Sequence, residues 1–132
     1  MDISVACPKG YETSKEILNT AREYAAENNT EIIVSDDIEV ALENVDVVYT
    51  DVWVSMGDEI ESAQRKIDFK PYQVNSDLMK LANDDAIFMH CLPAIRGQEV
   101  SADVIDGPQS VVFDEAENRL HAQKAVLYYY LK

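Results

Sequence analysis

The sequence is short of basic charge and has no long apolar run, and each shortage excludes a class of function. It has 11 Lys or Arg against 25 Asp or Glu, so its net charge is −14 and its pI is near 4.3. Nucleic acids and anionic membranes would repel such a surface, so we expect neither as a partner. No apolar run approaches the roughly 20 residues of a spanning helix, and Met1-Asp2 begins no basic leader.

Cysteine is scarce, and several common motifs are missing. Cys7 and Cys91 are too few for a disulfide framework, and a thiol beside a histidine suggests a reducing compartment, so we expect a soluble, cytoplasmic protein. The sequence has no Gly-x-Gly-x-x-Gly, P-loop lysine or nucleophile elbow, which removes the main support for nucleotide-binding and hydrolase functions. At 132 residues the chain is about one domain, and it contains no repeat or linker.

Short apolar strands alternate with helices along the chain. A first strand at 3–7 ends at Pro8, and Thr13 with Glu16 forms a capping box for a helix. This helix carries an apolar stripe made of Ile17, Leu18, Ala21, Tyr24 and Ala25. The other predicted strands are short and rich in β-branched residues, and they lie at 31–34, 45–50, 86–91 and 110–113.

The other predicted helices follow capping residues or helical spacing, and they lie at 38–42, 60–67, 76–82, 102–105 and 115–131. The last helix has one side formed by Ala116, Leu120, Gln123, Leu127 and Leu131. Strands without polar alternation are buried on both faces, which predicts a parallel sheet covered by helices on both sides. We therefore predict a single α/β domain over residues 1–132.

Three of the predicted strands end in polar residues. Asp51 follows the strand at 45–50, His90 and Cys91 close the strand at 86–91, and Arg119 lies in the helix that follows the last strand. Ligands of parallel α/β sheets bind beyond the carboxyl ends of the strands. We therefore predict that these three strand ends converge on one pocket.

His90 and Cys91 could each be a core residue or a residue of a functional site. Position alone favours a core thiol and a core histidine bonded to a carbonyl, because thiol reactivity needs a lowered pKa. Two cysteines and two histidines (Cys7, His90, Cys91 and His121) also suggest zinc. Adjacent strand residues point to opposite faces, however, so His90 and Cys91 should not share an ion, and we expect no metal.

Asp51 and Arg119 also allow two interpretations. Asp51 would either cap a helix or hold an ammonium group, with Trp53 as packing or as an apolar wall beside that group. The segment Ser55-Met56-Gly57 has the character of a loop that can close. Arg119 would either form a weak surface ion pair or point its donors at an anionic or carbonyl oxygen of a ligand.

Four motifs resemble, in order and spacing, those of the ornithine carbamoyltransferase family: Ala6-Cys7-Pro8-Lys9-Gly10-Tyr11, Asp51-Val52-Trp53-Val54-Ser55-Met56-Gly57, His90-Cys91-Leu92-Pro93-Ala94 and Asp114-Glu115-Ala116-Glu117-Asn118-Arg119. The resemblance spans essentially the whole chain and implies the ornithine-binding domain, with a Rossmann-like, doubly wound parallel sheet. Aspartate carbamoyltransferases look like His-Pro-Leu-Pro at the third motif, and putrescine enzymes depart at the Ser-Met-Gly loop.

This resemblance implies a reaction and its binding residues. The neutral δ-amine of L-ornithine would attack the carbamoyl carbon of carbamoyl phosphate, giving L-citrulline and phosphate without metal or organic cofactor. Asp51, Ser55 and Met56 would hold the amino-acid end of ornithine, with Asp51 on its α-ammonium group.

The resemblance places three residues at the carbamoyl group. Cys91 and the backbone of Leu92 would lie near the carbamoyl group and the side-chain amine of ornithine, and Arg119 would contact the carbamoyl oxygen. Asp51, Cys91 and Arg119 are thus the predicted catalytic residues. Closure of the loop at 55–57 would exclude water, which this chemistry needs because carbamoyl phosphate decomposes.

Parts of the family pattern are absent from the sequence. Proteins of the family have a first half that carries a Ser-x-Arg-Thr-Arg phosphate cradle and a His-Pro-x-Gln motif. Neither motif occurs in this sequence, and the first strand and helix of the ornithine domain do not occur either. By family topology that strand is central and lies between the strands that end at Cys7 and Thr50. We therefore expect a hole in the sheet with two unpaired edges.

These departures predict that the chain is a fragment of the enzyme and inactive alone. The alternatives are a subunit that complements a separately encoded first half, an ornithine-binding module without catalysis, or a carbamoyltransferase for another amine. The family forms homotrimers, largely through contacts of the half that does not occur here.

Overall fold

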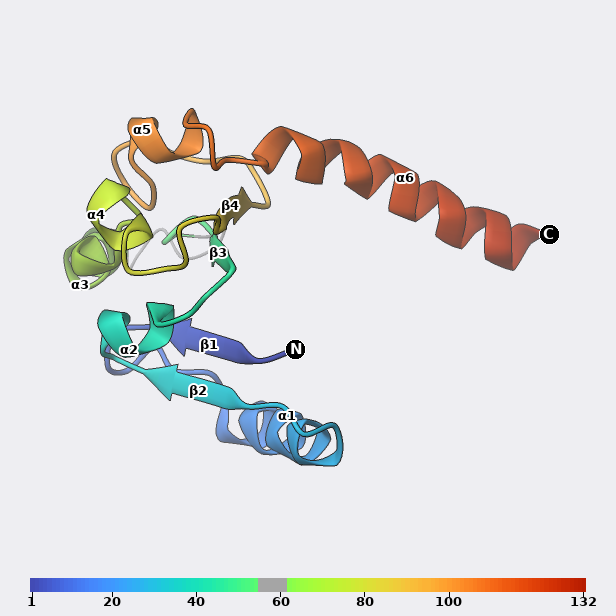
Figure 1. Ribbon diagram of the computed structural model, residues 1–132, viewed down its shortest axis with the longest axis horizontal. Coiled ribbons are helices and arrows are strands. Elements are labelled where there is room, and N and C mark those ends of the chain that lie inside the picture. Colours follow the sequence, from blue (N-terminus) through green and yellow to red (C-terminus); the bar gives the residue numbers. More distant parts are fainter. Residues whose placement is uncertain (55–61) are drawn as a thin grey trace.

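The computed structural model describes residues 1–54 and 62–132, in which strands and helices alternate (Figure 1). The elements in chain order are β1 (Ile3–Ala6), α1 (Lys15–Glu27), β2 (Ile32–Ser35), α2 (Ile38–Leu42), β3 (Val47–Thr50), α3 (Ser62–Asp68), the 3-10 helix η2 (Lys70–Tyr72), α4 (Ser76–Met79), β4 (Ile87–His90), α5 (Ala102–Ile105) and α6 (Val112–Leu131). Among the described helices, none has the length and apolar character needed to cross a membrane.

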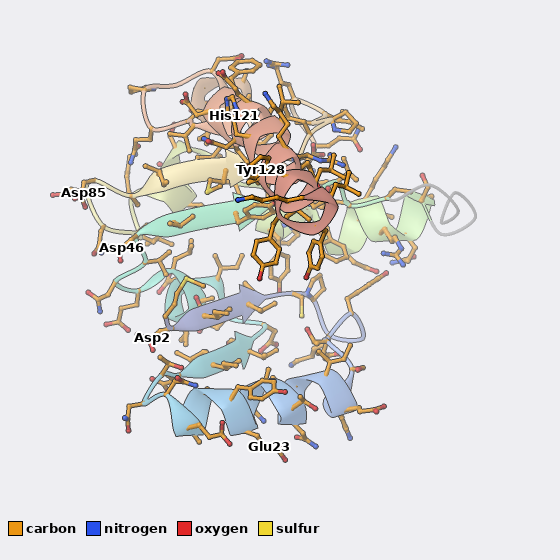
Figure 2. All side chains as sticks on the ribbon, turned by 90° about the vertical axis from the view of Figure 1, so that its right-hand side faces the viewer. Asp2, Glu23, Asp46, Asp85, His121 and Tyr128 are labelled. Atoms are coloured by element: carbon orange, nitrogen blue, oxygen red, sulfur yellow. The ribbon has the colours of Figure 1, made fainter. Side chains whose placement is uncertain are left out.

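The four strands form two separate parallel pairs. β1 pairs with β2, and β3 pairs with β4. The strands lie side by side in the order β4, β3, β1, β2, but within the described residues β3 and β1 are not joined by ladder hydrogen bonds (Figure 2). The predicted parallel α/β arrangement is therefore confirmed, and so is the gap in the middle of the sheet.

A cavity of about 370 Å³ occupies this gap. Its walls come from β1, α2, β3 and the segment 69–78, with side chains that include Ala6, Leu42, Val47 and Phe69. Facing strand edges carry N–H and C=O groups with no ladder partner. The gap is thus a slot between two hydrogen-bonding edges, and polar side chains such as Ser4, Thr50 and Arg65 line it beside the apolar ones.

The hydrophobic core belongs to the half that contains β3 and β4. Its buried members come from these strands and from α4, α5, the start of α6 and the segments between them: Val48, Val74, Met79, Ala82, Ala86, Phe88, Val100, Val104, Ile105 and Val112. The strands β1 and β2 contribute no residue to this cluster, and their side chains are at best half-buried. The two halves of the sheet are therefore unequally packed.

Several contacts among the described residues join the two halves near the ends of the strands. The Tyr72 hydroxyl donates to the Asp36 carbonyl (2.8 Å), and the Tyr11 hydroxyl donates to Asp68 (2.9 Å). The Tyr11 and Phe69 rings lie edge to face with centroids 4.8 Å apart. These contacts hold β1 beside β3 although the strands do not pair.

The first helix differs from its prediction in cap and burial. The N-cap is Ser14, whose Oγ accepts the Ile17 N–H at 3.3 Å, instead of the predicted box between Thr13 and Glu16. One-residue errors of this kind are usual at helix ends. Of the predicted apolar stripe, Ala25 is buried, whereas Ile17 and Tyr24 are each 64% exposed.

The predicted strand at 110–113 is wrong. Ser110 forms a single bridge to Phe88, and α6 already begins at Val112. The β-branched pair Val111-Val112 suggested a strand, but good helix formers follow, and Asp114 and Glu115 complement the helix dipole in the first turn.

The helix α6 also lacks the predicted buried side. It projects away from the rest of the chain, and Leu120, Leu127 and Leu131 on its predicted inner side are all exposed (Figure 1). The apolar spacing of α6 therefore finds no partner among the described residues.

We expect Phe88→Ala to cost about 3–5 kcal/mol of unfolding free energy, because the ring is fully buried and its removal leaves a cavity. The matched control is Phe113→Ala, which removes a ring that is 73% exposed and should change stability by no more than about 0.5 kcal/mol. Urea denaturation of the two variants measures both values. Equal losses in the two variants would contradict this placement of the core.

Candidate functional site

The register of β3 and β4 brings two predicted site residues together. Thr50 pairs with His90, so the next residues of the two strands, Asp51 and Cys91, leave the sheet side by side. The Cys91 thiol donates a hydrogen bond to Asp51 Oδ1 at 3.1 Å. The same oxygen accepts the Val52 N–H at 2.7 Å, so Asp51 also stabilises the turn after β3.

Glu115 connects this pair of strand ends to α6. Its Oε2 accepts the backbone N–H of His90 at 3.0 Å, and its Oε1 accepts the Tyr49 hydroxyl at 3.2 Å. The Tyr49 hydroxyl also lies near the Cys91 side chain, and each of the two groups affects the pKa of the other. Two hydrogen-bonded pairs, Cys91 with Asp51 and Tyr49 with Glu115, therefore lie at the ends of β3, β4 and α6.

These contacts keep the hydroxyl and the thiol protonated. Desolvation, with the neighbouring Cys91 and Glu115 side chains, raises the pKa of Tyr49 to about 12. Desolvation and the hydrogen bond to Asp51 also raise the pKa of the Cys91 thiol, which the neighbouring Tyr49 hydroxyl only partly offsets. At neutral pH the Cys91 side chain is thus a neutral hydrogen-bonding group and not a thiolate nucleophile.

The expectation that His90 and Cys91 would stay apart is wrong. Possible ligand atoms of Asp51, His90 and Cys91 all lie within 4.8 Å of one another, because β4 ends at His90 and strand alternation does not extend to Cys91. Both ring nitrogens of His90 already face protein groups, since Nδ1 accepts the Leu92 N–H at 2.9 Å and Nε2 lies 3.4 Å from Glu99. Cys7 and His121 do not join this group within the described residues.

Arg119 is not brought into contact with Asp51 or Cys91. It lies on α6 one turn beyond Glu115 and is exposed, and its guanidinium has no hydrogen bond or ion pair within the described ranges. Ser55 and Met56 lie outside the described residues. Two of the three predicted strand ends, at Asp51 and Cys91, therefore lie side by side, and Arg119 does not join them.

The cavity between the strand pairs touches this site at one end. Its lining includes Tyr49, Asp51 and Trp53 but neither Cys91 nor Arg119. Trp53 is buried against Phe69, with ring centroids 6.4 Å apart, so it packs as an apolar wall near Asp51. Asp51 thus stands between the cavity and the Cys91 thiol.

Sequence reasoning missed the roles of Tyr49 and Glu115. Tyr49 looked like one apolar residue of a strand, and Glu115 like an ordinary acid of a helix start. The signal for Tyr49 is the register, since a residue two positions before Asp51 points to the same side of the strand. The contact of Glu115 depends on where α6 begins, which the sequence misplaced.

Comparisons with known proteins agree with these motifs. A family model described as "Aspartate/ornithine carbamoyltransferase, Asp/Orn binding domain" matches residues 1–130. The ornithine carbamoyltransferase of Methanobrevibacter smithii is 75% identical over the whole chain, which spans 44% of that relative. The chain therefore covers less than half the length of this curated relative.

Solved structures give the same picture of the fold. The ornithine carbamoyltransferase from Pyrococcus furiosus has a TM-score of 0.89 at 54% identity, with 96% of this chain and 40% of that chain covered. An N-acetyl-L-ornithine transcarbamylase has a TM-score of 0.81 at 33% identity, covering 96% of this chain and 39% of that chain. The predicted Rossmann-like fold is confirmed by this likeness.

We expect two substitutions around Cys91 to change its alkylation rate in opposite directions. Asp51→Asn removes a carboxylate that raises the thiol pKa, so the rate with iodoacetamide should rise. Tyr49→Phe removes a neighbouring hydroxyl that lowers this pKa, so the rate should fall. Each change should be roughly two- to tenfold near about pH 8, because one pKa unit is tenfold in thiolate fraction below the pKa.

The measurement uses the chain with Cys7→Ala, so that Cys91 is the remaining cysteine. The same variants unfolded in denaturant are the control, and there the rates should agree. Changes of equal sign in the two folded variants would contradict the described surroundings of Cys91.

Proposed function

Because the chain belongs to the family of aspartate/ornithine carbamoyltransferases, as an Asp/Orn binding domain, we propose that it forms the ornithine-binding part of an ornithine carbamoyltransferase. The reaction is carbamoyl transfer from carbamoyl phosphate to the δ-amine of L-ornithine, giving L-citrulline and phosphate. The observation that carries the proposal is the contact between Asp51 and Cys91, which brings the second and third motifs to one point at the ends of neighbouring strands.

In this proposal Asp51 and Cys91 bind and orient without taking part in covalent chemistry. The carboxylate of Asp51 attracts the α-ammonium group of ornithine, and Ser55 and Met56 contact the same end of the amino acid. The Cys91 thiol stays neutral at neutral pH, so it does not compete with the δ-amine for the carbamoyl carbon. Positioning of the amine and stabilisation of oxyanion charge then provide the rate enhancement.

Arg119 is proposed as the group that contacts the carbamoyl oxygen. Its guanidinium is exposed and unpaired within the described residues, so its donors are free for a ligand. Glu115, one turn earlier on α6, is held by His90 and Tyr49 and so fixes this end of the helix beside the strand ends. In this proposal Arg119 approaches a ligand at the ends of β3 and β4, from the part of α6 that Glu115 holds there.

We propose that a second half, with the phosphate-binding motifs, is needed for turnover. The chain spans 44% of the Methanobrevibacter smithii relative. Two of its features would suit contact with further protein: the slot between the unpaired edges of β1 and β3, and the exposed apolar residues of α6. The chain alone is then inactive as a carbamoyltransferase, and trimer formation is a property of the completed enzyme.

Two other functions are ranked below this one. A subunit that complements a separately encoded half uses the same slot and helix, and it differs only in where the second half is encoded. A free-standing ornithine-binding module is favoured less, because Arg119 and the slot would then remain without a role. A carbamoyltransferase for another amine is disfavoured by the lower identity to the N-acetyl-L-ornithine enzyme.

We expect the purified chain to form no citrulline from ornithine and carbamoyl phosphate. Activity should appear when it is co-expressed with the part of the Methanobrevibacter smithii relative that the chain does not cover. In the complemented enzyme, Asp51→Asn should lower kcat/KM for ornithine by roughly tenfold to a hundredfold, because a hydrogen bond to a charged group is worth about 1.5–3 kcal/mol. A colorimetric citrulline assay measures all three results.

The control is Asp84→Asn, which changes an exposed acid of a loop and should leave the activity unchanged. Substantial turnover by the chain alone would refute its dependence on a second half. Calorimetry of the chain with ornithine separates the remaining possibilities, because binding heat without activity after complementation would favour the binding module.

A further inference from the structure

Two fully buried ionisable side chains lie behind the Cys91 loop and are used by no step described so far. His90 is 0% exposed and Glu99 is 1% exposed, and the His90 Nε2 atom lies 3.4 Å from Glu99 Oε1. Acids are almost never fully buried unless they are paired. Their burial beside a candidate binding site therefore needs a reason.

The hydrogen bond at His90 Nδ1 identifies the tautomer of the ring. Nδ1 accepts the Leu92 N–H at 2.9 Å, so Nδ1 carries no proton and the ring is neutral with its proton on Nε2. That Nε2–H group faces Glu99 Oε1. Although the 3.4 Å contact lacks the alignment of a hydrogen bond, it leaves the carboxylate as the neighbour that favours this tautomer.

Glu99 is itself held from the loop that follows Cys91. Its Oε1 accepts the Ile95 N–H at 2.5 Å, and its carbonyl accepts the Val74 N–H at 2.9 Å. One carboxylate oxygen therefore faces both the imidazole and the backbone four residues before it. The His90 ring and the Ile95 N–H group therefore both face the buried carboxylate of Glu99.

Leu92, whose N–H group donates to His90 Nδ1, has an uncommon backbone conformation. Leu92 has a φ of +53°, a region that non-glycine residues rarely adopt, so neighbouring contacts must support it. The bond from the Leu92 N–H to His90 Nδ1 is such a support. It also fixes the direction in which Cys91, one residue earlier, leaves β4.

We propose that Glu99 and His90 are positioning residues that hold the Leu92 backbone, and through it the Cys91 thiol, in the geometry that faces Asp51. This inference rests on the proposed function for its role in carbamoyl transfer. Glu99 selects the Nε2–H tautomer of His90, and that tautomer leaves Nδ1 free to accept the Leu92 N–H. The Leu92 N–H is consequently engaged by the protein and not offered to a substrate.

The first test is the tautomer of His90 in the full 132-residue chain. A ¹⁵N–¹H correlation spectrum of the imidazoles should show an unprotonated Nδ1 and a protonated Nε2 for His90, with His121 on the exposed face of α6 as the internal reference. A proton on Nδ1 of His90 would overturn the proposal. This readout does not depend on activity or on a second half of the enzyme.

The second test compares Glu99→Gln with Glu99→Leu. Glutamine keeps a carbonyl oxygen for the Ile95 N–H and the His90 Nε2–H, so the tautomer, the Leu92 amide shift and the Cys91 alkylation rate should stay as in the parent chain. Leucine has a similar volume but no acceptor, so the ring can change tautomer, and the Leu92 amide shift and the alkylation rate should both change, the latter by at least twofold.

A purely structural role predicts a different result. Glu99→Leu would then lower the urea midpoint while the Leu92 shift and the Cys91 rate of the folded variant stayed at their parent values, and this outcome would refute the inference. If the leucine variant does not fold, His90→Asn replaces it, because asparagine offers Oδ1 to the Leu92 N–H without needing Glu99. Cys91 reactivity should then be retained even when Glu99→Gln is added, and its loss would count against the proposal.

The complemented enzyme provides the functional arm. Glu99→Leu should raise KM for ornithine more than it lowers kcat, and Glu99→Gln should restore both. Normal kinetics of the leucine variant would contradict the positioning role even if the tautomer is as described. Failure of the complemented parent enzyme to make citrulline, with the tautomer intact, would refute the proposed function and leave the assignment of the pair standing.

Discussion

The parallel register of β3 on β4 is the constraint on which the rest of the site depends. The pairing of Thr50 with His90 makes both strands end at the same level, and it sets Asp51 beside Cys91. A slip of one residue would turn every side chain of one strand to the other face. The burial of Val48 and Phe88 in the core opposes such a slip, so the packing below the site determines the geometry above it.

This dependence explains why part of the site could be predicted. Apolar runs that stop at Asp51 and at His90 identify two strand ends, and the edge rule for parallel sheets brings such ends together without knowledge of the coordinates. The order of the elements followed in the same way from apolar spacing and capping residues. The prediction worked where a residue's place is decided by the position of its own strand.

The prediction failed where a contact depends on the exact residue at which a second element begins. The hydrogen bonds of Glu115 depend on α6 beginning at Val112, and a run of β-branched residues suggested a strand there. Glu99 lies in a connection without helical or strand periodicity, so nothing in its neighbours marks it as buried. Periodic patterns reveal which side of an element is apolar, but they do not identify a buried acid in a loop.

Apolar spacing also predicted burial that the described chain does not provide. The stripe on α6 and the exposed Ile17 and Tyr24 on α1 follow the spacing of core-facing residues, yet all are open to solvent. Their spacing indicates helix faces that can pack against further protein. The unpaired edges of β1 and β3 can likewise form hydrogen bonds with a further strand. Both features are consistent with a chain that spans 44% of a close relative.

The slot and the site meet at Asp51, and this joins completion of the sheet to binding. Any parallel strand that paired with β1 and β3 would fill the cavity and would end near Asp51 and Trp53, which line the same cavity. It would cover cavity walls that are now open, and it would add its own terminal residues to the edge at which Asp51 and Cys91 lie. The half that contains β3 and β4 already has its own packed core, so these two strands keep their register without the additional strand. Under the proposed function, closing the sheet and completing the ornithine pocket are therefore a single event, because the same strand edge borders both.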